Sequence, residues 1–99
     1  MPSEELREPL SPTQAKALAR KILKEGLYAF SGHAEQEMEK EKPPLTQPDC
    51  VNVLRGGAYE PGEWENGSWR YRAHTARITV VITFRSKTEL LVVTAWRNR

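Results

Sequence analysis

Three ionisable side chains alternate along the segment from Trp69 to His74. Arg70, Arg72 and His74 stand at every second position, so in an extended strand they lie on one face. Cationic groups side by side repel one another unless an anion lies among them, and the planar fork of arginine suits a phosphate. The pattern predicts a phosphate-binding face. An exposed strand face that carries arginine for solubility and edge protection fits the pattern equally well.

A histidine stands near the start of a predicted helix, in the segment Ser31-Gly32-His33-Ala34. In the first turn of a helix the dipole disfavours a charged imidazolium, so we expect a neutral imidazole that can act as a general base. Glu37 follows four residues later on the same helix face and is a candidate to orient His33. From local sequence alone, a histidine that only helps to cap the helix is the favoured interpretation.

Aromatic and basic residues also meet at the end of the chain, where Trp96 precedes Arg97. Aromatic rings beside arginines are typical of sites for unpaired RNA bases, so Trp96 or Tyr71 is a candidate to hold a base. Metal binding has little support, because His33, His74 and Cys50 lack a recognised ligand spacing. A glycine-rich phosphate loop and a nucleophile elbow are absent from the sequence. We therefore expect no metal and no cofactor.

Charge is distributed unevenly along the chain. Residues 67–99 hold seven Lys and Arg and one acid, whereas residues 1–66 hold eight Lys and Arg and twelve acids. Such segregation predicts a positive field whose usual partner is a polyanion, although a basic sheet face balanced by acidic helices is the alternative. The first predicted helix has a basic outer stripe, which we interpret by default as a solvated face. The stripe consists of Lys16, Arg20, Lys21 and Lys24.

Helices are predicted in the first half of the chain. Capping residues and apolar spacing indicate one helix from Ser11-Pro12 to Gly26, a second over roughly residues 32–41, and a third from Thr46 to Gly56-Gly57. Residues 27–30 form a short strand or an extended lead-in. The second helix would carry both His33 and Glu37.

From Ala58 the apolar period changes to two, which is typical of strands. Asn66-Gly67 is a strong hairpin signal between a weak strand over residues 59–64, interrupted at Pro61-Gly62, and a strand over residues 68–74. Two further strands are predicted over residues 77–85 and 89–96. The last is apolar on both faces and is therefore expected to be central.

Together these elements predict one α+β domain over residues 11–99, with N-terminal helices packed on a four- to five-stranded, mainly antiparallel sheet. Residues 1–10 are expected to form a flexible tail. A single cysteine excludes an intrachain disulfide, and no apolar run approaches the ~20 residues that cross a bilayer. The acidic start lacks the apolar core of a signal peptide, so we expect a cytoplasmic protein outside the membrane.

Several segments resemble motifs of the DUF4258 family. Residues 31–38, SGHAEQEM, resemble the S-x-H-A-x-x-R-M motif, and residues 45–51, LTQPDCV, are similar to the segment I-S-x-x-D-V. Three later segments resemble strand motifs of the family: residues 70–72 resemble R-Y-R-V, residues 80–82 resemble V-V-V, and residues 93–96 resemble V-V-T-x-Y/W. The family is grouped with small toxins of the RelE and barnase/colicin-like ribonuclease fold. The resemblance therefore implies a RelE/BECR-like sheet that cleaves RNA without metal, with a cognate antitoxin or immunity protein as partner.

The resemblance also implies roles for individual residues. It makes His33, Arg70 and Arg72 catalytic candidates, and it adds Thr94 to the candidate substrate-binding residues Tyr71, Trp96 and Arg97. The motif's arginine is Glu37 here, which implies either lost activity or use of Glu37 as the acid or base.

The expected mechanism is attack of the RNA 2′-hydroxyl on the adjacent phosphate. His33 and His74 would be general base and acid in either order, with Glu37 as orienter or substitute base, while Arg70 and Arg72 stabilise the transition state. The alternative is a non-catalytic RNA-binding or protein-interaction module of a toxin–antitoxin-like pair.

Overall fold

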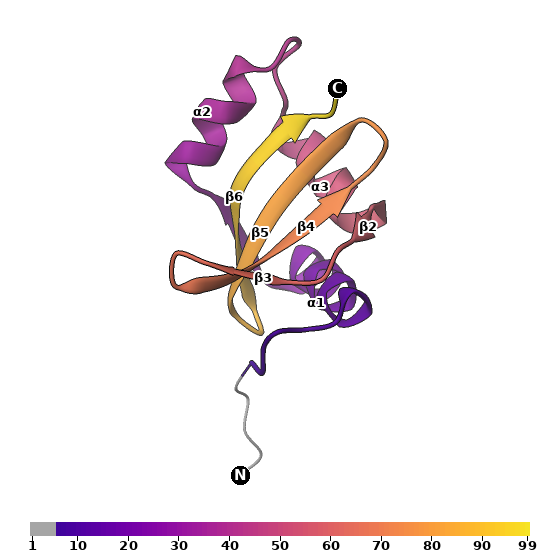
Figure 1. Ribbon diagram of the computed structural model, residues 1–99, viewed down its shortest axis with the longest axis vertical. Helices are drawn as coiled ribbons and strands as arrows, with labels where there is room; N and C mark the ends of the chain where they lie inside the picture. Colours follow the sequence, from indigo (N-terminus) through magenta and orange to yellow (C-terminus); the bar gives the residue numbers. More distant parts are fainter. Residues whose placement is uncertain (1–5) are drawn as a thin grey trace.

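The computed structural model describes residues 6–99 (Figure 1). In this range all three helices precede five of the six strands. This is the α+β class expected from the sequence, and one continuous core joins its elements. The described residues contain three helices and six strands: α1 (Pro12–Glu25), β1 (Leu27–Phe30), α2 (Gly32–Lys40), α3 (Gln47–Gly56), β2 (Ala58–Tyr59), β3 (Glu63–Glu65), β4 (Ser68–His74), β5 (Ile78–Ser86) and β6 (Glu89–Arg97).

Each helix begins at a hydroxyl residue that caps it. The side chain of Ser11 accepts a hydrogen bond from the amide of Gln14, and Thr46 does the same for Asp49, each in a reciprocal capping box. Ser31 accepts from the amide of Ala34 at the start of α2. These contacts satisfy amides that have no partner inside the helix, and they confirm the three predicted helix starts.

The sheet has six strands, which corrects the expected four to five. Its order is β1-β6-β5-β4-β2, with β3 paired to β4 beside this path. Leu27–Phe30, expected as a short strand or an extended lead-in, is a strand that pairs parallel to β6, whereas the other neighbours are antiparallel. The weak strand expected over residues 59–64 divides at Pro61-Gly62 into β2 and β3, and this division gives the sixth strand. The last strand, β6, is central as predicted, between β1 and β5.

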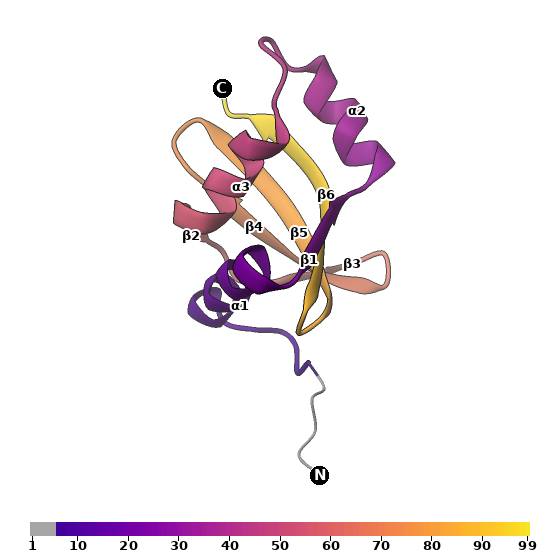
Figure 2. The same cartoon turned by 180° about the vertical axis from the view of Figure 1, so that it is seen from behind.

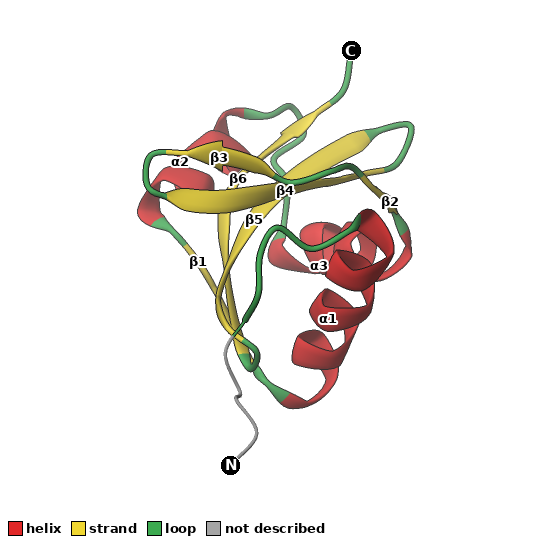
Figure 3. Ribbon diagram, turned by 60° about the horizontal axis from the view of Figure 1, so that its bottom comes forward, coloured by secondary structure: helices red, strands yellow, loops and turns green. Residues whose placement is uncertain are grey.

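Helices α1 and α3 lie together against one face of the sheet (Figure 3), and α2 lies apart from them beside β6 (Figure 2). Alternation along the strands therefore separates a core face from an outer face. The outer face of β4, β5 and β6 is bordered by α2 and by the β3–β4 hairpin. The core combines Ala15, Ala19 and Ile22 of α1, Cys50, Val53 and Leu54 of α3, and Tyr71, Ala73, Val80, Ile82, Phe84, Leu90, Val92 and Ala95 of the sheet.

The segment before α1 differs from the expected flexible tail where it is described. The hydroxyl of Tyr71 donates a hydrogen bond to Oε2 of Glu8 at 2.8 Å and accepts one from the amide of Leu10 at 3.0 Å. Leu6 and Leu10 also pack against the core. Burial raises the pKa of Glu8 and raises that of Tyr71 to about 12. Residues 6–10 are thus held against the sheet, and residues 1–5 lie outside the described residues.

Candidate functional site

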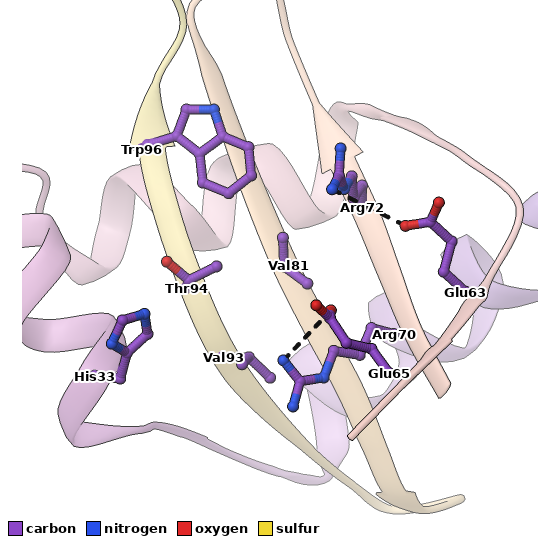
Figure 4. Close-up of a pocket in the computed structure, with 9 residues that line it drawn as sticks. All are labelled: His33, Glu63, Glu65, Arg70, Arg72, Val81, Val93, Thr94 and Trp96. Atoms are coloured by element: carbon purple, nitrogen blue, oxygen red, sulfur yellow. Dashed lines mark ion pairs between the residues drawn. The ribbon is translucent and has the colours of Figure 1, made fainter. Parts of the chain in front are cut away.

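A cavity of about 230 Å³ opens on the outer face of the sheet, away from α1 and α3. Side chains from five elements meet in it, with an imidazole on one side and a cluster of guanidinium and carboxylate groups on the other (Figure 4). Its apolar floor is formed by side chains of the central strands. The lining residues are His33 of α2, Glu63 and Glu65 of β3, Arg70 and Arg72 of β4, Val81 of β5, and Val93, Thr94 and Trp96 of β6.

An irregularity in β6 shapes the side of the cavity that faces α2. Val81 pairs with Thr94, but the next residue of β5, Ile82, pairs with Val92, so Val93 is left as an extra residue. Such a β-bulge bends its strand and redirects the side chains around it. The bulge thus gives the cavity two consecutive residues of β6, Val93 and Thr94.

Ser31 fixes the start of α2 to this bulge. Its amide donates to the carbonyl of Val92 at 3.0 Å, and its hydroxyl donates to the carbonyl of Val93 at 3.1 Å. The same hydroxyl accepts from the amide of Ala34 at 2.9 Å. One side chain therefore caps the helix and ties it to the sheet, two residues before His33. This double role places the imidazole at the rim of the cavity.

The two arginines of the cavity face carboxylates of the neighbouring strand. Arg70 lies 3.7 Å from Glu65, and Arg72 lies 4.0 Å from Glu63 (Figure 4). Both distances exceed the roughly 3.2 Å limit of an N–H···O hydrogen bond, so these are loose ion pairs. Within residues 6–99, Nε of Arg70 is buried and has no hydrogen-bond partner. Because neither ion pair reaches hydrogen-bond length, the terminal N–H groups of both guanidinium groups are left for an oxyanion to bind.

Trp96 holds one of these arginines in place. The guanidinium carbon of Arg72 lies 5.9 Å from the centre of the Trp96 ring, within the range of a cation–π contact. Thr94 lies between Trp96 and His33 along the cavity (Figure 4). The cavity thus presents an aromatic ring, a hydroxyl, an imidazole and two guanidinium groups together.

Two predicted substrate-binding residues lie elsewhere. Tyr71 is fully buried on the core face, because it alternates with Arg70 and Arg72, and its hydroxyl is engaged by Glu8. Arg97 follows Trp96 and points away from it, and its Nε donates to the carbonyl of Pro43 at 2.8 Å. Neither side chain lines the cavity, so the structure does not bring these two candidates together with the others.

Two predicted catalytic residues also lie outside the cavity. Glu37 accepts a hydrogen bond from Lys40 at 3.0 Å, which lowers the pKa of this carboxyl. His74 lies 3.3 Å from Glu60, beyond Arg72 on the same strand face. The structure therefore brings together five of the nine predicted residues: His33, Arg70, Arg72, Thr94 and Trp96.

Sequence reasoning missed the carboxylates of Glu63 and Glu65, although a signal for them was present. The Asn66-Gly67 turn has positive φ at both residues, 51° and 84°, as a two-residue hairpin requires. Such a turn fixes the register and sets Glu65 opposite Ser68 and Glu63 opposite Arg70. The acids of residues 60–65 thereby offset much of the positive field expected over β4.

Neither metal ligation nor a known relative gives this site an identity. Among residues 6–99 no three His, Cys, Asp or Glu side chains converge in a way that could hold a metal ion. No helix in the same range is long and apolar enough to cross a membrane. No protein-family model, no curated protein and no solved structure matches the chain. The resemblance to DUF4258 motifs therefore stays a prediction.

Proposed function

We propose that the chain is a metal-independent endoribonuclease that cleaves RNA by attack of a 2′-hydroxyl on the adjacent phosphate. The observation that carries the proposal is the single cavity in which His33, two arginines and two glutamates meet beside an indole. These are the group types that transesterification of a phosphodiester needs: a base, an acid and cations that stabilise the added negative charge.

Arg70 and Arg72 are the proposed phosphate ligands. Their carboxylate contacts are too long for hydrogen bonds, so a phosphate can take the donors without breaking a strong pair. The cation–π contact with Trp96 keeps Arg72 oriented while the phosphate enters. Fixed donors of this kind stabilise the transition state without reorganisation.

Acid–base work falls to His33 and to one carboxylate of β3, because Glu37 and His74 do not line the cavity. His33 and the carboxylates lie on opposite sides of the cavity (Figure 4). An in-line displacement places the attacking and leaving oxygens on opposite sides of phosphorus. One group removes the proton of the 2′-hydroxyl, and the other protonates the departing 5′-oxygen. The products are a 2′,3′-cyclic phosphate and a free 5′-hydroxyl.

The test compares two histidine variants on a short single-stranded RNA in the presence of EDTA. We expect His33→Ala to lower the cleavage rate by about 10²-fold or more, the usual contribution of a general acid or base. His74→Ala serves as the matched control and retains activity, because its imidazole pairs with Glu60 outside the cavity. Intact RNA after incubation with the wild type, or equal rates for His33→Ala and wild type, would overturn the proposal.

A second candidate is a non-catalytic RNA-binding or protein-interaction module. It is favoured by the carboxylate that faces each cavity arginine, and by Glu37 in place of the arginine of the motif it resembles. Salt-dependent RNA binding without products would support this candidate. An antitoxin or immunity protein that covers Arg70 and Arg72 belongs to the toxin proposal and rests on the resemblance. The proposed cytoplasmic location rests instead on the sequence, whose single cysteine fits a reducing compartment.

A further inference from the structure

A second hollow lies on the helical side of the molecule, where α1 and α3 are neighbours (Figure 2). It is a groove of about 470 Å³, and every side chain that lines it is charged. Four are cations: Arg20, Lys21 and Lys24 of α1 and Arg55 of α3. The single acid is Glu25.

The four cations are exposed, and none has an acidic partner within 4.0 Å among residues 6–99. Lys24 and Arg55 stand in the last turns of their helices, where a positive charge stabilises the helix dipole. Arg20 and Lys21 have no such structural role. Packing α1 against α3 therefore concentrates positive charge that the fold itself does not neutralise.

We propose that this α1–α3 groove binds the sugar–phosphate backbone of RNA as a second, non-catalytic contact, an inference that rests on the proposed ribonuclease function. Phosphate binding needs only cations and carries no sequence information. Protein interfaces, in contrast, rely on aromatic and apolar anchors, and the groove offers none. A membrane surface would need an exposed apolar face, but α1 buries Ala15, Ala19 and Ile22 in the core.

The two RNA contacts lie on opposite faces of the sheet, so one strand must pass around the edge of the domain to reach both. Lys87, in the turn between β5 and β6, lies beside Lys21 at a smaller pocket and continues the positive charge towards this edge. At about 3.4 Å per nucleotide, a trinucleotide extends only about 10 Å, whereas a strand of about 20 nucleotides extends about 70 Å and is long enough to pass around the domain. The groove therefore strengthens the binding of long RNA and leaves the cleavage of very short RNA unchanged.

The experiment measures binding of a labelled 20-nucleotide RNA by fluorescence anisotropy. Its 2′-O-methyl groups prevent cleavage, and the salt concentration is varied. The double variant Arg20→Gln/Lys21→Gln removes two groove cations, and the matched control Arg77→Gln/Lys42→Gln removes one exposed arginine and one exposed lysine that line neither the groove nor the cavity. Each phosphate contact to a single strand contributes about 0.7 to the slope of log K against log salt, so the groove variant should lose about 1.4. At 0.1 M salt this corresponds to roughly 25-fold weaker binding.

The control variant should bind as the wild type does, and all three proteins should cleave a trinucleotide at the same rate. Equal affinity and equal salt slopes for the groove and control variants would overturn the groove proposal, as expected if an acidic protein is the true occupant. If no form cleaves RNA, the ribonuclease proposal fails, but the binding comparison still decides the groove. Urea midpoints of the variants check that each one is folded.

Discussion

Replacing Ser31 with alanine tests whether this side chain positions His33 in addition to capping α2. The substitution removes the cap of α2, which costs about 1 kcal/mol, and the hydrogen bond to the carbonyl of Val93, which costs about 1 kcal/mol more. Ser11→Ala is the matched control, because Ser11 caps α1 with the same atom but its hydroxyl forms no second hydrogen bond to another element among residues 6–99. We therefore expect a loss of about 2 kcal/mol for Ser31→Ala and about 1 kcal/mol for Ser11→Ala.

Urea denaturation measures both losses, and thermal melting should show the difference as about 4–8 °C for a domain of this size. The proposed RNA cleavage provides a second measurement. Without the hydroxyl, only the backbone hydrogen bond to Val92 ties the first turn of α2 to the bulge, so the imidazole is less firmly fixed. A displacement of about 1 Å can lower kcat/KM by up to about 100-fold. Ser11→Ala should leave kcat/KM unchanged. Equal losses of stability, or equal kcat/KM values in the two folded variants, would refute the idea that Ser31 positions His33.

Two further predictions concern stability. Gly57→Ala should destabilise the fold by about 1–3 kcal/mol, because a Cβ there meets the backbone carbonyl oxygens of Val53 at 2.6 Å and His74 at 2.7 Å. The control is Gly56→Ala, whose Cβ meets nothing within 4 Å and which should be near neutral. Equal urea midpoints for the two variants would contradict this prediction. A hydrogen bond from the amide of Thr46 lowers the pKa of Asp49 below its ordinary 3.8. The ionised carboxylate therefore stabilises the fold above about pH 3.8, and this stabilisation is lost as the pH falls further. Asp49→Asn should lose less stability than the wild type between pH 7 and pH 3, and identical losses would show that this carboxyl is not linked to folding.

Helix starts and strand faces could be predicted because their signals are local. Ser11, Ser31 and Thr46 each cap a helix within three residues of themselves. The two-residue turn at Asn66-Gly67 likewise fixes the hairpin register. Alternation placed Arg70 and Arg72 on one face and, by the same rule, Tyr71 on the other. An assignment of all three to one site was therefore inconsistent with the sequence pattern itself.

Long-range pairing could not be predicted from local patterns. The strand Leu27–Phe30 lies parallel to β6, which is about 60 residues later in the chain, and no short-range signal specifies this partner. The bulge at Val93 could not be predicted either, because β6 contains no glycine that would indicate it in the sequence. Similarly, Glu37 shares a helix with His33, but the nearer Lys40 holds its carboxylate away from the cavity. Competition among nearby partners decided where this side chain points.

The carboxylates of Glu63 and Glu65 face both cavity arginines, and their negative charge opposes phosphate binding. The Arg72–Glu63 pair is exposed, and such pairs contribute about 0–1 kcal/mol. The Arg70–Glu65 pair joins a mostly buried arginine to an exposed glutamate, and at 3.7 Å it lacks a hydrogen bond, as the other pair does at 4.0 Å. A phosphate that accepts hydrogen bonds from the same guanidinium groups gains about 1.5–3 kcal/mol for each bond. We therefore expect a phosphate to displace a carboxylate from its arginine. In the proposed reaction one hairpin thus has two roles: it holds the arginines in place before RNA binds, and it supplies a proton-transfer group once the phosphate has taken them.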